Sequence, residues 1–335
     1  MRVVRVTAFG GPDVLRTQEA PDPVPGAGEV VVEVAAVDTM FVETQVRAGW
    51  GLEYFPVRPP YTLGGGIAGT VRAVGAGVDG GWTGRRVVAS MGITGGAVQR
   101  AVASVEALTP VPDGLPLTTA AAVFQDGVTA LALLDATAVA AGTRVLILGA
   151  SGGMGTLLTQ LAKAQGAYVA GVARGARKTA LVRKLGADAV IDGTDSGWPG
   201  RAREALGAAG GPAGGPRGGA AGAEVVLDGV GGAMGAAALP LTADGGRFSA
   251  HGAPTGGFAA VTPQEAADRG IRLLTIADAQ ISEEVRVRLA ARALAEAAAG
   301  RLRPVIGATY PLERAADAHR AIEGRDLVGK VLLTV

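Results

Sequence analysis

Apolar residues in the first 120 or so positions occur in short, often alternating runs that are typical of β-strands. Glycine and proline separate these runs, as in PDPVPGAGE and GAGVDGGWTG. This spacing predicts a barrel-like antiparallel domain rather than parallel units. Strands are expected at Val3–Phe9, Glu29–Val37, Gly69–Val74 and Arg86–Ser90.

The pattern changes near Thr118. Residues 118–140 are rich in alanine and predict a helix, and apolar strand-like runs then alternate with helical ones. Such alternation predicts a parallel sheet with crossover helices. The expected strands are 144–148, 167–173, 189–192, 224–228 and 247–251, and the expected helices include 153–165 and 175–186.

The C-terminal part returns to a mixed pattern. A strand is expected at 271–276, and Ser282 with two following glutamates suits the start of a helix over 282–299. A strand at 304–310, a helix at 312–323 and a final strand at 328–335 follow. We expect the last strand to rejoin the first domain.

The domain organisation follows from that return. One domain comprises residues 1–122 plus 258–335, and residues 123–257 form a second domain inserted into it. Residues 207–223 are almost entirely glycine, alanine and proline, which predicts a loop on the rim of the inserted domain.

Composition limits the chemistry. The chain of 335 residues contains no cysteine and two histidines, His251 and His319. A zinc site of four cysteines is excluded, a catalytic zinc with cysteine or several histidine ligands is nearly so, and no acidic cluster indicates magnesium, so no metal site is expected.

Charge and hydropathy limit the partners. Lysine and arginine total 31 against 30 acidic residues, which argues against a nucleic-acid surface. No long uninterrupted apolar run predicts a membrane span, and the N-terminal residues read as a strand rather than a secretory signal. We therefore expect a soluble cytoplasmic protein that acts on a small molecule.

The segment between the expected strand 144–148 and the helix after it fits the pattern A-x-G-x-x-G. Small residues there let the backbone approach a pyrophosphate, and the helix start directs free amides at the anion. With 54 glycines the motif alone is weak, but its strand–turn–helix context predicts a dinucleotide site. The alternative is a tight turn that binds nothing. The residues are Ala150, Ser151, Gly152, Gly153, Met154 and Gly155.

The second strand of this unit ends on a cation. A carboxylate at that position would accept hydrogen bonds from the adenosine ribose, but the chain has Ala173-Arg174, with Lys178 one turn further. Cationic donors suit a 2′-phosphate, which predicts NADP(H) as the cofactor. Alternatively, both side chains are solvated surface residues.

Several segments together resemble the zinc-free quinone oxidoreductase (zeta-crystallin-like) branch of the medium-chain dehydrogenase/reductase superfamily. The resemblance covers nearly the whole chain. It implies a GroES-like β-barrel catalytic domain with an inserted Rossmann domain, hydride transfer from NADPH to a quinone or an activated C=C bond, and a homodimer paired through Rossmann edge strands. The segments are TAFGGPDVL, GEVVVEVAAV, GGGIAGTVRAVGAGV, GVTALALL, GTRVLILGASGGMG, LAKAQGA, KLGADAVID, VLDGVGG and DAHRAIEGRDLVGKVLL.

The resemblance also implies roles for single residues. Thr129 matches a threonine near the nicotinamide, and Lys178 and Arg325 match residues on the 2′-phosphate. Val230 and Gly252 lie in turns at strand ends, where such a sheet places its ligand.

Three positions depart from the family. Gly193 stands where a tyrosine often holds the phosphate. Met40 and Glu43 stand where the family commonly has asparagine and aspartate.

Tyr54 lies where related enoyl reductases carry a proton donor, so we expect it to protonate the enolate left by hydride transfer. The alternatives are a pocket wall at Tyr54 and protonation by solvent. His251 is otherwise a polar packing residue, His319 is expected to be structural, and Gln125 and Asp126 either border the cleft or cap a helix. The expected substrate pocket comprises Met40, Glu43, Trp50, Phe55, Tyr61 and His251.

The predicted function is therefore NADPH-dependent reduction of a quinone or of the C=C bond of an α,β-unsaturated carbonyl, without zinc. Two alternatives stay open. One is an enoyl-thioester reductase of polyketide or lipid assembly, and the other is a catalytically silent NADPH-binding protein.

Overall fold

The computed structural model describes residues 1–209, 222–275, 278 and 281–335. The chain forms two compact units, Met1–Val128 with Ser282–Val335 (unit 1) and Thr129–Ile281 (unit 2). Most of the expected loop 207–223 lies outside the described residues. Unit 2 extends beyond residue 257 because strand β14, Arg272–Thr275, pairs in parallel with β13.

Unit 1 is built mainly from strands. A seven-stranded sheet has the order β15-β16-β3-β5-β6-β8, with β7 also paired to β3. Its neighbours are antiparallel except for β15 and β16. The strands are β3 (Glu29–Thr39), β5 (Gly66–Val74), β6 (Arg86–Ser90), β7 (Arg100–Ser104), β8 (Leu108–Pro110), β15 (Ile306–Pro311) and β16 (Lys330–Thr334).

Strand β3 organises this sheet. Its first half pairs with β7 and its second half with β16, on the edge opposite β5. The predicted return of the last strand to the first domain is therefore confirmed. A second sheet has the order β2-β1-β4, with β1 at Arg2–Val6, β2 at Leu15–Glu19 and β4 at Tyr61–Thr62.

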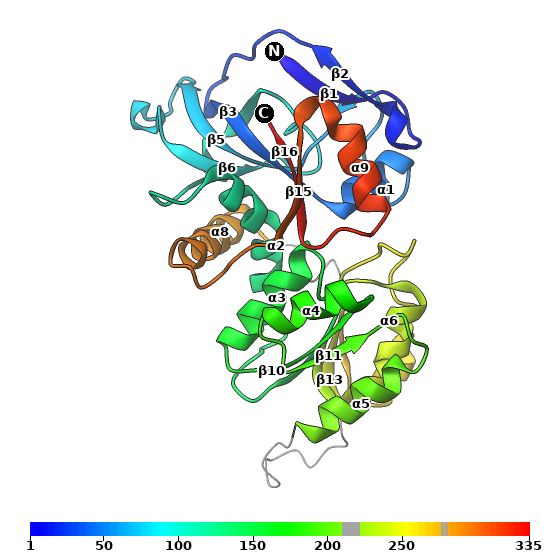
Figure 1. The fold of residues 1–335 in the computed structure, drawn as a ribbon. Coiled ribbons are helices and arrows are strands. Elements are labelled where there is room, and N and C mark those ends of the chain that lie inside the picture. The colour runs from blue at the N-terminus through cyan, green and yellow to red at the C-terminus, as the bar shows by residue number, and fades with distance from the viewer. Residues whose placement is uncertain (210–221, 276–277, 279–280) are drawn as a thin grey trace. The chain divides into compact units, whose positions relative to one another are not determined.

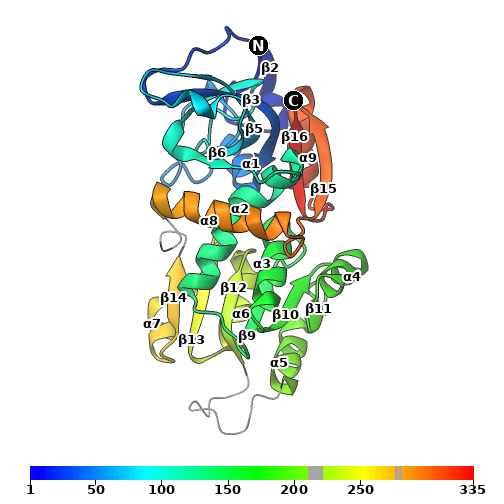
Figure 2. The ribbon, with the colours of Figure 1, turned by 90° about the vertical axis from the view of Figure 1, so that its left-hand side faces the viewer.

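Helices complete unit 1, as Figures 1 and 2 show. Helix α9 packs on β15 and β16, and α8 packs on β8. Val30, Val32 and Val34 of β3 join the apolar core of unit 1, and Val31 between them is buried as well. The helices are α1 (Phe41–Ala48), α8 (Glu283–Ala298) and α9 (Ala315–Glu323), with 3-10 turns at Pro12–Val14, Gly80–Trp82, Val105–Ala107 and Leu312–Arg314.

Unit 2 is a six-stranded parallel sheet in the order β11-β10-β9-β12-β13-β14. Adjacent residues of β9, from Val145 to Leu148, are all at most 1% exposed, so both faces of the sheet are covered. This is the doubly wound topology that the alternating pattern predicts. Its strands are β9 (Arg144–Leu148), β10 (Tyr168–Ala173), β11 (Ala189–Asp192), β12 (Ala223–Asp228), β13 (Thr242–Ala250) and β14.

Crossover helices connect these strands (Figure 2). Trp198 and Leu206 of α5 and Leu239 of the 3-10 turn Leu239–Leu241 fill the core against one face. The helices are α3 (Gly153–Ala164), α4 (Ala176–Lys184), α5 (Trp198–Ala208), α6 (Gly232–Ala238) and α7 (Pro263–Ala267).

Helix α2, Leu117–Ala136, runs from unit 1 into unit 2. It is the one described helix that is long and apolar enough to cross a membrane, but 72% of its apolar window is buried within the protein. That burial is typical of a core helix.

Candidate functional site: a glycine-built edge in unit 2 and a polar interior in unit 1

The glycine turn joins β9 to α3. Gly149 has a φ of 74°, a conformation that glycine adopts without strain. Helix α3 begins at Gly153, and its N-cap residue, Gly152, provides no side-chain cap. The amides of the first helical turn have no partner within the helix, so they are available to an anion.

Gly155 allows α3 to start against this turn. A Cβ atom on Gly155 would lie 2.2 Å from the Gly149 carbonyl oxygen and 2.8 Å from the Ala150 Cα. Such distances are too short for any side chain, so helix and turn pack backbone on backbone. The structure thus places the predicted residues Ala150 to Gly155 at the C-terminal end of β9.

The neighbouring strand ends are packed in the same way. A Cβ on Gly149 would lie 3.1 Å from Val230 Cγ2, and one on Gly252 would lie 2.2 Å from the Gly229 carbonyl carbon. Val230 and Gly252 follow β12 and β13, so the ends of β9, β12 and β13 form one close-packed edge. The strand order reverses between β9 and β12, and ligands of open α/β sheets bind at such a point.

Two positive residues follow β10. Arg174 is exposed and makes no ion pair with a described residue, and Lys178 is half-buried in the first turn of α4. The nearby carboxylate, Asp192 at the end of β11, accepts hydrogen bonds from the Gly175 amide at 3.0 Å and from Thr194. These bonds lower the pKa of Asp192, the Gly175 bond contributing most. A Cβ on Gly193 would lie 2.7 Å from Met234 Cε.

Two buried polar side chains lie behind the strand ends. The Asp228 carboxylate accepts the amides of Val230 and Gly231, each at 2.9 Å, and so fixes the turn after β12. His251 is 7% exposed, and its Nδ1 lies 3.2 Å from the Ser249 hydroxyl. Burial lowers the pKa of His251 to about 4, so the ring is neutral at neutral pH.

In unit 1, Met40 and Glu43 lie at the start of α1. Met40 is the N-cap residue, and Glu43 is the third residue of the helix, 2% exposed. Glu43 Oε1 accepts the Gly65 amide at 3.0 Å and thereby ties α1 to the segment before β5. Burial, followed by the charge of Asp38, raises the pKa of Glu43 to about 8 despite that hydrogen bond.

Tyr61 belongs to the same interior. It is 9% exposed, and burial, followed by the charge of Glu43, raises its pKa to about 12. Arg47 lies further along α1 and forms an ion pair with Glu323. His319, fully buried in α9, has no hydrogen-bond partner among the described residues at either ring nitrogen.

The remaining predicted residues are less buried than Glu43 and Tyr61. Tyr54 is 50% exposed in the segment after α1, whereas Trp50 and Phe55 are half-buried there. Arg325, at a φ of 57°, places its guanidinium 5.8 Å from the ring centre of Phe41. Thr129, half-buried in α2, is the first residue of unit 2.

Unit 1 holds a buried charge cluster that was not predicted from the sequence. Lys330 Nζ of β16 lies 2.5 Å from Asp38 Oδ1 of β3 and 3.0 Å from Asp126 Oδ2 of α2. Burial alone would lower the pKa of Lys330, but the two carboxylates outweigh it and raise that pKa. Two signals were available, namely Asp38 after the apolar run Val34–Val37 and Lys330 at the start of the apolar strand β16.

Gln125 extends this cluster. Its Nε2 donates to the Gly65 carbonyl at 3.0 Å, while the Gly65 amide donates to Glu43. Gln125 and Asp126 lie within α2, so the alternative that they cap a helix is wrong, and both tie α2 to unit 1.

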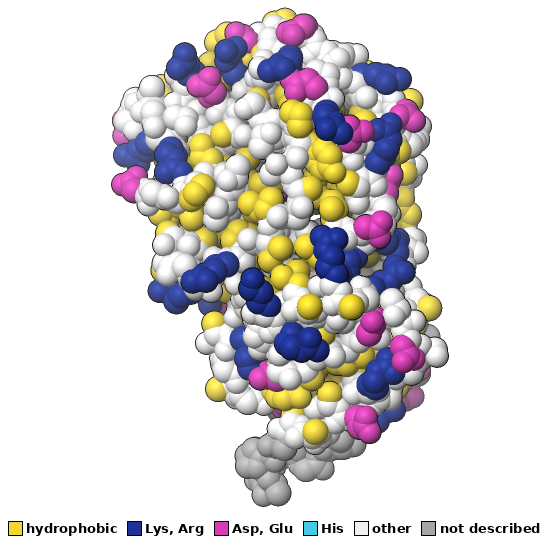
Figure 3. Space-filling view, in the orientation of Figure 1, with side chains coloured by type: hydrophobic (Ala, Val, Ile, Leu, Met, Phe, Trp, Pro, Cys, Tyr) yellow, Lys and Arg dark blue, Asp and Glu magenta, His cyan; other side chains and the backbone are white. Residues whose placement is uncertain are grey.

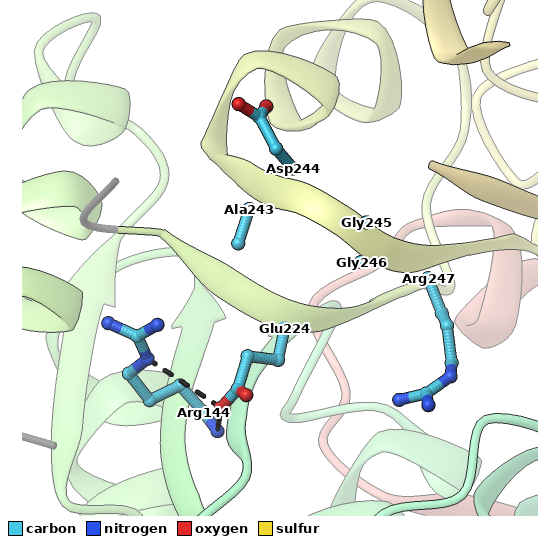
Figure 4. A pocket seen from close by; sticks show the side chains of 7 residues that line it. All are labelled: Arg144, Glu224, Ala243, Asp244, Gly245, Gly246 and Arg247. Carbon is cyan, nitrogen blue, oxygen red and sulfur yellow. Dashed lines mark hydrogen bonds and ion pairs between the residues drawn. The ribbon is translucent and has the colours of Figure 1, made fainter. Parts of the chain in front are cut away.

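A small cavity of about 40 Å³ lies at the opposite end of the parallel sheet (Figure 4). Arg144, which begins β9, and Glu224 of β12 form an ion pair at 3.7 Å within it. The cavity is far too small for a dinucleotide.

In Figure 3, Lys and Arg are interspersed with Asp and Glu on the face of unit 1 that is drawn.

A strand-rich unit made from both ends of the chain, with an inserted doubly wound sheet that carries a glycine turn, is the architecture of the medium-chain dehydrogenase/reductase superfamily. The alcohol dehydrogenase GroES-like domain family matches residues 26–113, and the zinc-binding dehydrogenase family matches residues 185–333.

The relatives agree with this class. Quinone oxidoreductase of Sus scrofa is 32% identical over 338 residues, covering 99% of this chain and 97% of the relative. A 2-haloacrylate reductase of a Burkholderia species is 30% identical over 97% of this chain and 96% of the relative. The chain belongs to the quinone oxidoreductase family of medium-chain dehydrogenases/reductases and is an oxidoreductase.

Solved structures that are similar to this chain support the same family and fold. A mycobacterial protein in complex with NADPH has a TM-score of 0.88 at 32% identity, with full coverage of both chains. Escherichia coli quinone oxidoreductase in complex with NADPH has a TM-score of 0.89 at 26% identity, again with full coverage. The GroES-like and Rossmann domains predicted from the sequence are thereby confirmed.

One matched family is described as zinc-binding, so the donor set was compared with that metal. The chain has no cysteine, and its two histidines lie in different units. The described residues contain no group of three or more histidine, aspartate or glutamate side chains arranged to hold a metal ion. These donors do not fit a zinc site of the usual kind.

Proposed function

We propose that the protein is an NADPH-dependent reductase that transfers hydride to a quinone or to the C=C bond of an α,β-unsaturated carbonyl, without a metal. The observation that carries this is the close-packed glycine turn after β9 together with cationic residues after β10. The 2-haloacrylate reductase among the relatives supports the C=C substrate, and the quinone oxidoreductases support the quinone.

The residues of unit 2 fit the cofactor. The turn Ala150–Gly155 leaves backbone amides for the pyrophosphate, and Arg174 and Lys178 supply cations for the 2′-phosphate. Two further candidates come from the family resemblance, Arg325 of unit 1 for that phosphate and Thr129 for the nicotinamide end. NADPH, when bound, supplies the hydride.

The substrate side belongs to unit 1. We propose that Met40, Trp50, Phe55 and Tyr61 provide apolar and aromatic walls for a planar acceptor. Tyr54, half-exposed, is the proposed proton donor to the enolate, because a neutral phenol can give a proton to an oxyanion and is restored by water. Glu43 acts by holding the start of α1 rather than by touching substrate, since its carboxyl already binds the Gly65 amide.

The assembly we propose is a cytoplasmic homodimer. Strand β14 has one described neighbour, β13, and so presents its other edge for pairing with a second copy. The near-neutral charge offers no support for a nucleic-acid partner.

Cofactor preference tests the proposal. NADPH and NADH binding and oxidation are compared for the wild type, Arg174→Ser and Arg177→Ser, with a para-quinone and an enone as acceptors. We expect Arg174→Ser to raise the Kd for NADPH about tenfold, because a charge-assisted hydrogen bond is lost, and to leave NADH unchanged. Arg177, exposed in α4, is the matched control. A wild type that prefers NADH, or oxidises neither cofactor with either acceptor, refutes the proposal.

The proton donor is tested separately. Tyr54→Phe should lower kcat at least tenfold with the enone and leave the quinone rate unchanged, because a reduced quinone takes its protons from water. Equal rates for both enzymes would assign the proton to solvent.

A further inference from the structure

His251 stands out among the buried polar groups of unit 2. It is the first residue after β13, and its backbone amide donates to the Asp228 carbonyl at 3.1 Å. That hydrogen bond fixes the ring at the C-terminal edge of the sheet. In a packing role for His251, its two ring nitrogens, like most buried polar atoms, would have a hydrogen-bond partner within the fold.

Only one of them is satisfied. Nδ1 lies 3.2 Å from the Ser249 hydroxyl, and Ser249 is itself fully buried. Nε2 is buried and has no hydrogen-bond partner among the described residues. A buried polar atom left without a partner costs about 1–3 kcal/mol, so such an atom calls for an explanation.

The position of Nε2 indicates what it serves. It lies 3.5 Å from where a Cβ of Gly229 would be, beside the residue that follows β12. The Gly229 carbonyl oxygen in turn lies 3.8 Å from a Cβ position on Gly149, in the turn after β9. Nε2 is therefore on the same close-packed edge as the proposed pyrophosphate site.

The strand order decides which half of the dinucleotide it meets. Arg174 follows β10 on one side of β9, and the glycine turn follows β9 itself. If the adenosine end lies over β10 and the pyrophosphate over β9, the nicotinamide half lies over β12 and β13, across the switch point. His251 follows β13.

We propose that His251 is a cofactor-binding residue whose Nε2 forms a hydrogen bond with the nicotinamide riboside half of bound NADP(H). The inference rests on the proposed function. The Ser249 hydroxyl can either donate to or accept from Nδ1, so it can support either tautomer of a neutral ring. Nε2 can thus be the donor or the acceptor toward a carboxamide or a ribose hydroxyl.

Nuclear magnetic resonance tests the contact directly, because the chain has two histidines and therefore two sets of ring signals. The His319→Leu variant assigns them. On adding NADP⁺ to the wild type, we expect the His251 ring nitrogen and Hε1 signals to shift and those of His319 to stay. Titration with NADP⁺ to saturation without a shift of His251 overturns the proposal.

Calorimetry with two ligands separates this contact from general damage to the site. The ligands are NADP⁺ and 2′-phospho-ADP, which lacks both the nicotinamide ring and the ribose that carries it. His251→Phe should weaken NADP⁺ about tenfold, as expected for about 1.4 kcal/mol of hydrogen bonding, and change the affinity for 2′-phospho-ADP by less than twofold. His251→Gln, which places an amide near the position of Nε2, should restore most of the NADP⁺ affinity.

Other outcomes count against the proposal. Equal weakening of both ligands, or no weakening of either, would make His251 a packing residue. A wild type that binds neither ligand would instead refute the proposed function itself, so the two failures can be told apart.

Discussion

The interior of unit 1 and the strand ends of unit 2 are built from different kinds of residue. Unit 1 buries ionisable side chains, with Lys330 between Asp38 and Asp126, Glu43 on a backbone amide, and Arg47 on Glu323. The close-packed edge of unit 2, where β9, β12 and β13 end, is instead formed by glycine backbones in contact with neighbouring backbone. The stability of unit 1 should therefore depend on pH and on both members of each ion pair. The stability of unit 2 should instead be lowered by any side-chain atom added at these glycines.

The largest effect is expected at the glycine edge. Gly155→Val would place atoms within 2.2 Å of the Gly149 carbonyl oxygen. We expect it to reduce the free energy of unfolding by more than about 4 kcal/mol and to abolish NADPH binding, because backbone on both sides leaves no room to relax. Urea denaturation and NADPH fluorescence measure the two effects.

A matched glycine provides the control for that substitution. Gly200, in α5, has open space around its Cβ position. Gly200→Ala should be neutral or stabilise by up to about 1 kcal/mol through helix propensity. Similar losses at both glycines would contradict the steric account of the edge.

The next effect is expected at the buried charge cluster. Lys330→Met leaves Asp38 fully buried beside Asp126 without its cation, which should cost about 3 kcal/mol. The loss should be larger at pH 8 than at pH 5, because the stranded carboxyl must then take up a proton to fold, and that uptake becomes harder as pH rises. Adding Asp38→Asn should recover part of the stability, and strict additivity in urea denaturation would argue against direct coupling.

A smaller, pH-dependent effect is expected at His319. Burial, followed by the charge of Arg47, lowers the pKa of His319 to about 3. Below about pH 6.5 the histidine of the unfolded chain binds a proton, whereas that of the folded chain binds one only near pH 3. His319 therefore lowers the free energy of unfolding as the pH falls from about 6.5 toward 3. His319→Leu should therefore gain about 2 kcal/mol relative to the wild type on going from pH 8 to pH 5. A constant difference across that range would show that the folded protein accepts the proton.

The smallest effect is expected for an ion pair of unit 2. Lys163 Nζ lies 2.7 Å from Asp188 Oδ2, but both side chains are about 30% exposed (30% and 31%). Lys163→Met should cost only about 0.5–1 kcal/mol, because water screens such a pair. A loss as large as that for Lys330→Met would remove the distinction between the two units.

The same difference explains what the sequence could predict. The strands at 144–148 and 189–192 have the predicted bounds, because each is a short apolar run with a clear boundary. The glycine turn is local, so its place between β9 and α3 could be predicted as well. Helix α1 and the short strands β4, β7 and β8 were missed, because elements of eight residues or fewer give too short a window for a periodic pattern to be recognised.

Long-range pairing was the other limit. Asp38 and Lys330 come from nearly opposite ends of the chain, and only the pairing of β3 with β16 brings them together. No local pattern reports such a contact. The sequence could not predict either that Nε2 of His251 has no partner among the described residues, because this depends on which groups the folded chain places around the ring.

Because β16 pairs with β3, the two units can complete their folds at different times during synthesis. Unit 2 is one continuous stretch of chain, so its sheet can form as soon as residue 281 has left the ribosome. Unit 1 must wait for Lys330–Thr334, which are translated after the whole of unit 2. Until Lys330 has been translated, Asp38 lacks its counter-ion. The growing chain at that stage consists of an incomplete unit 1 joined to a complete, nucleotide-binding unit 2.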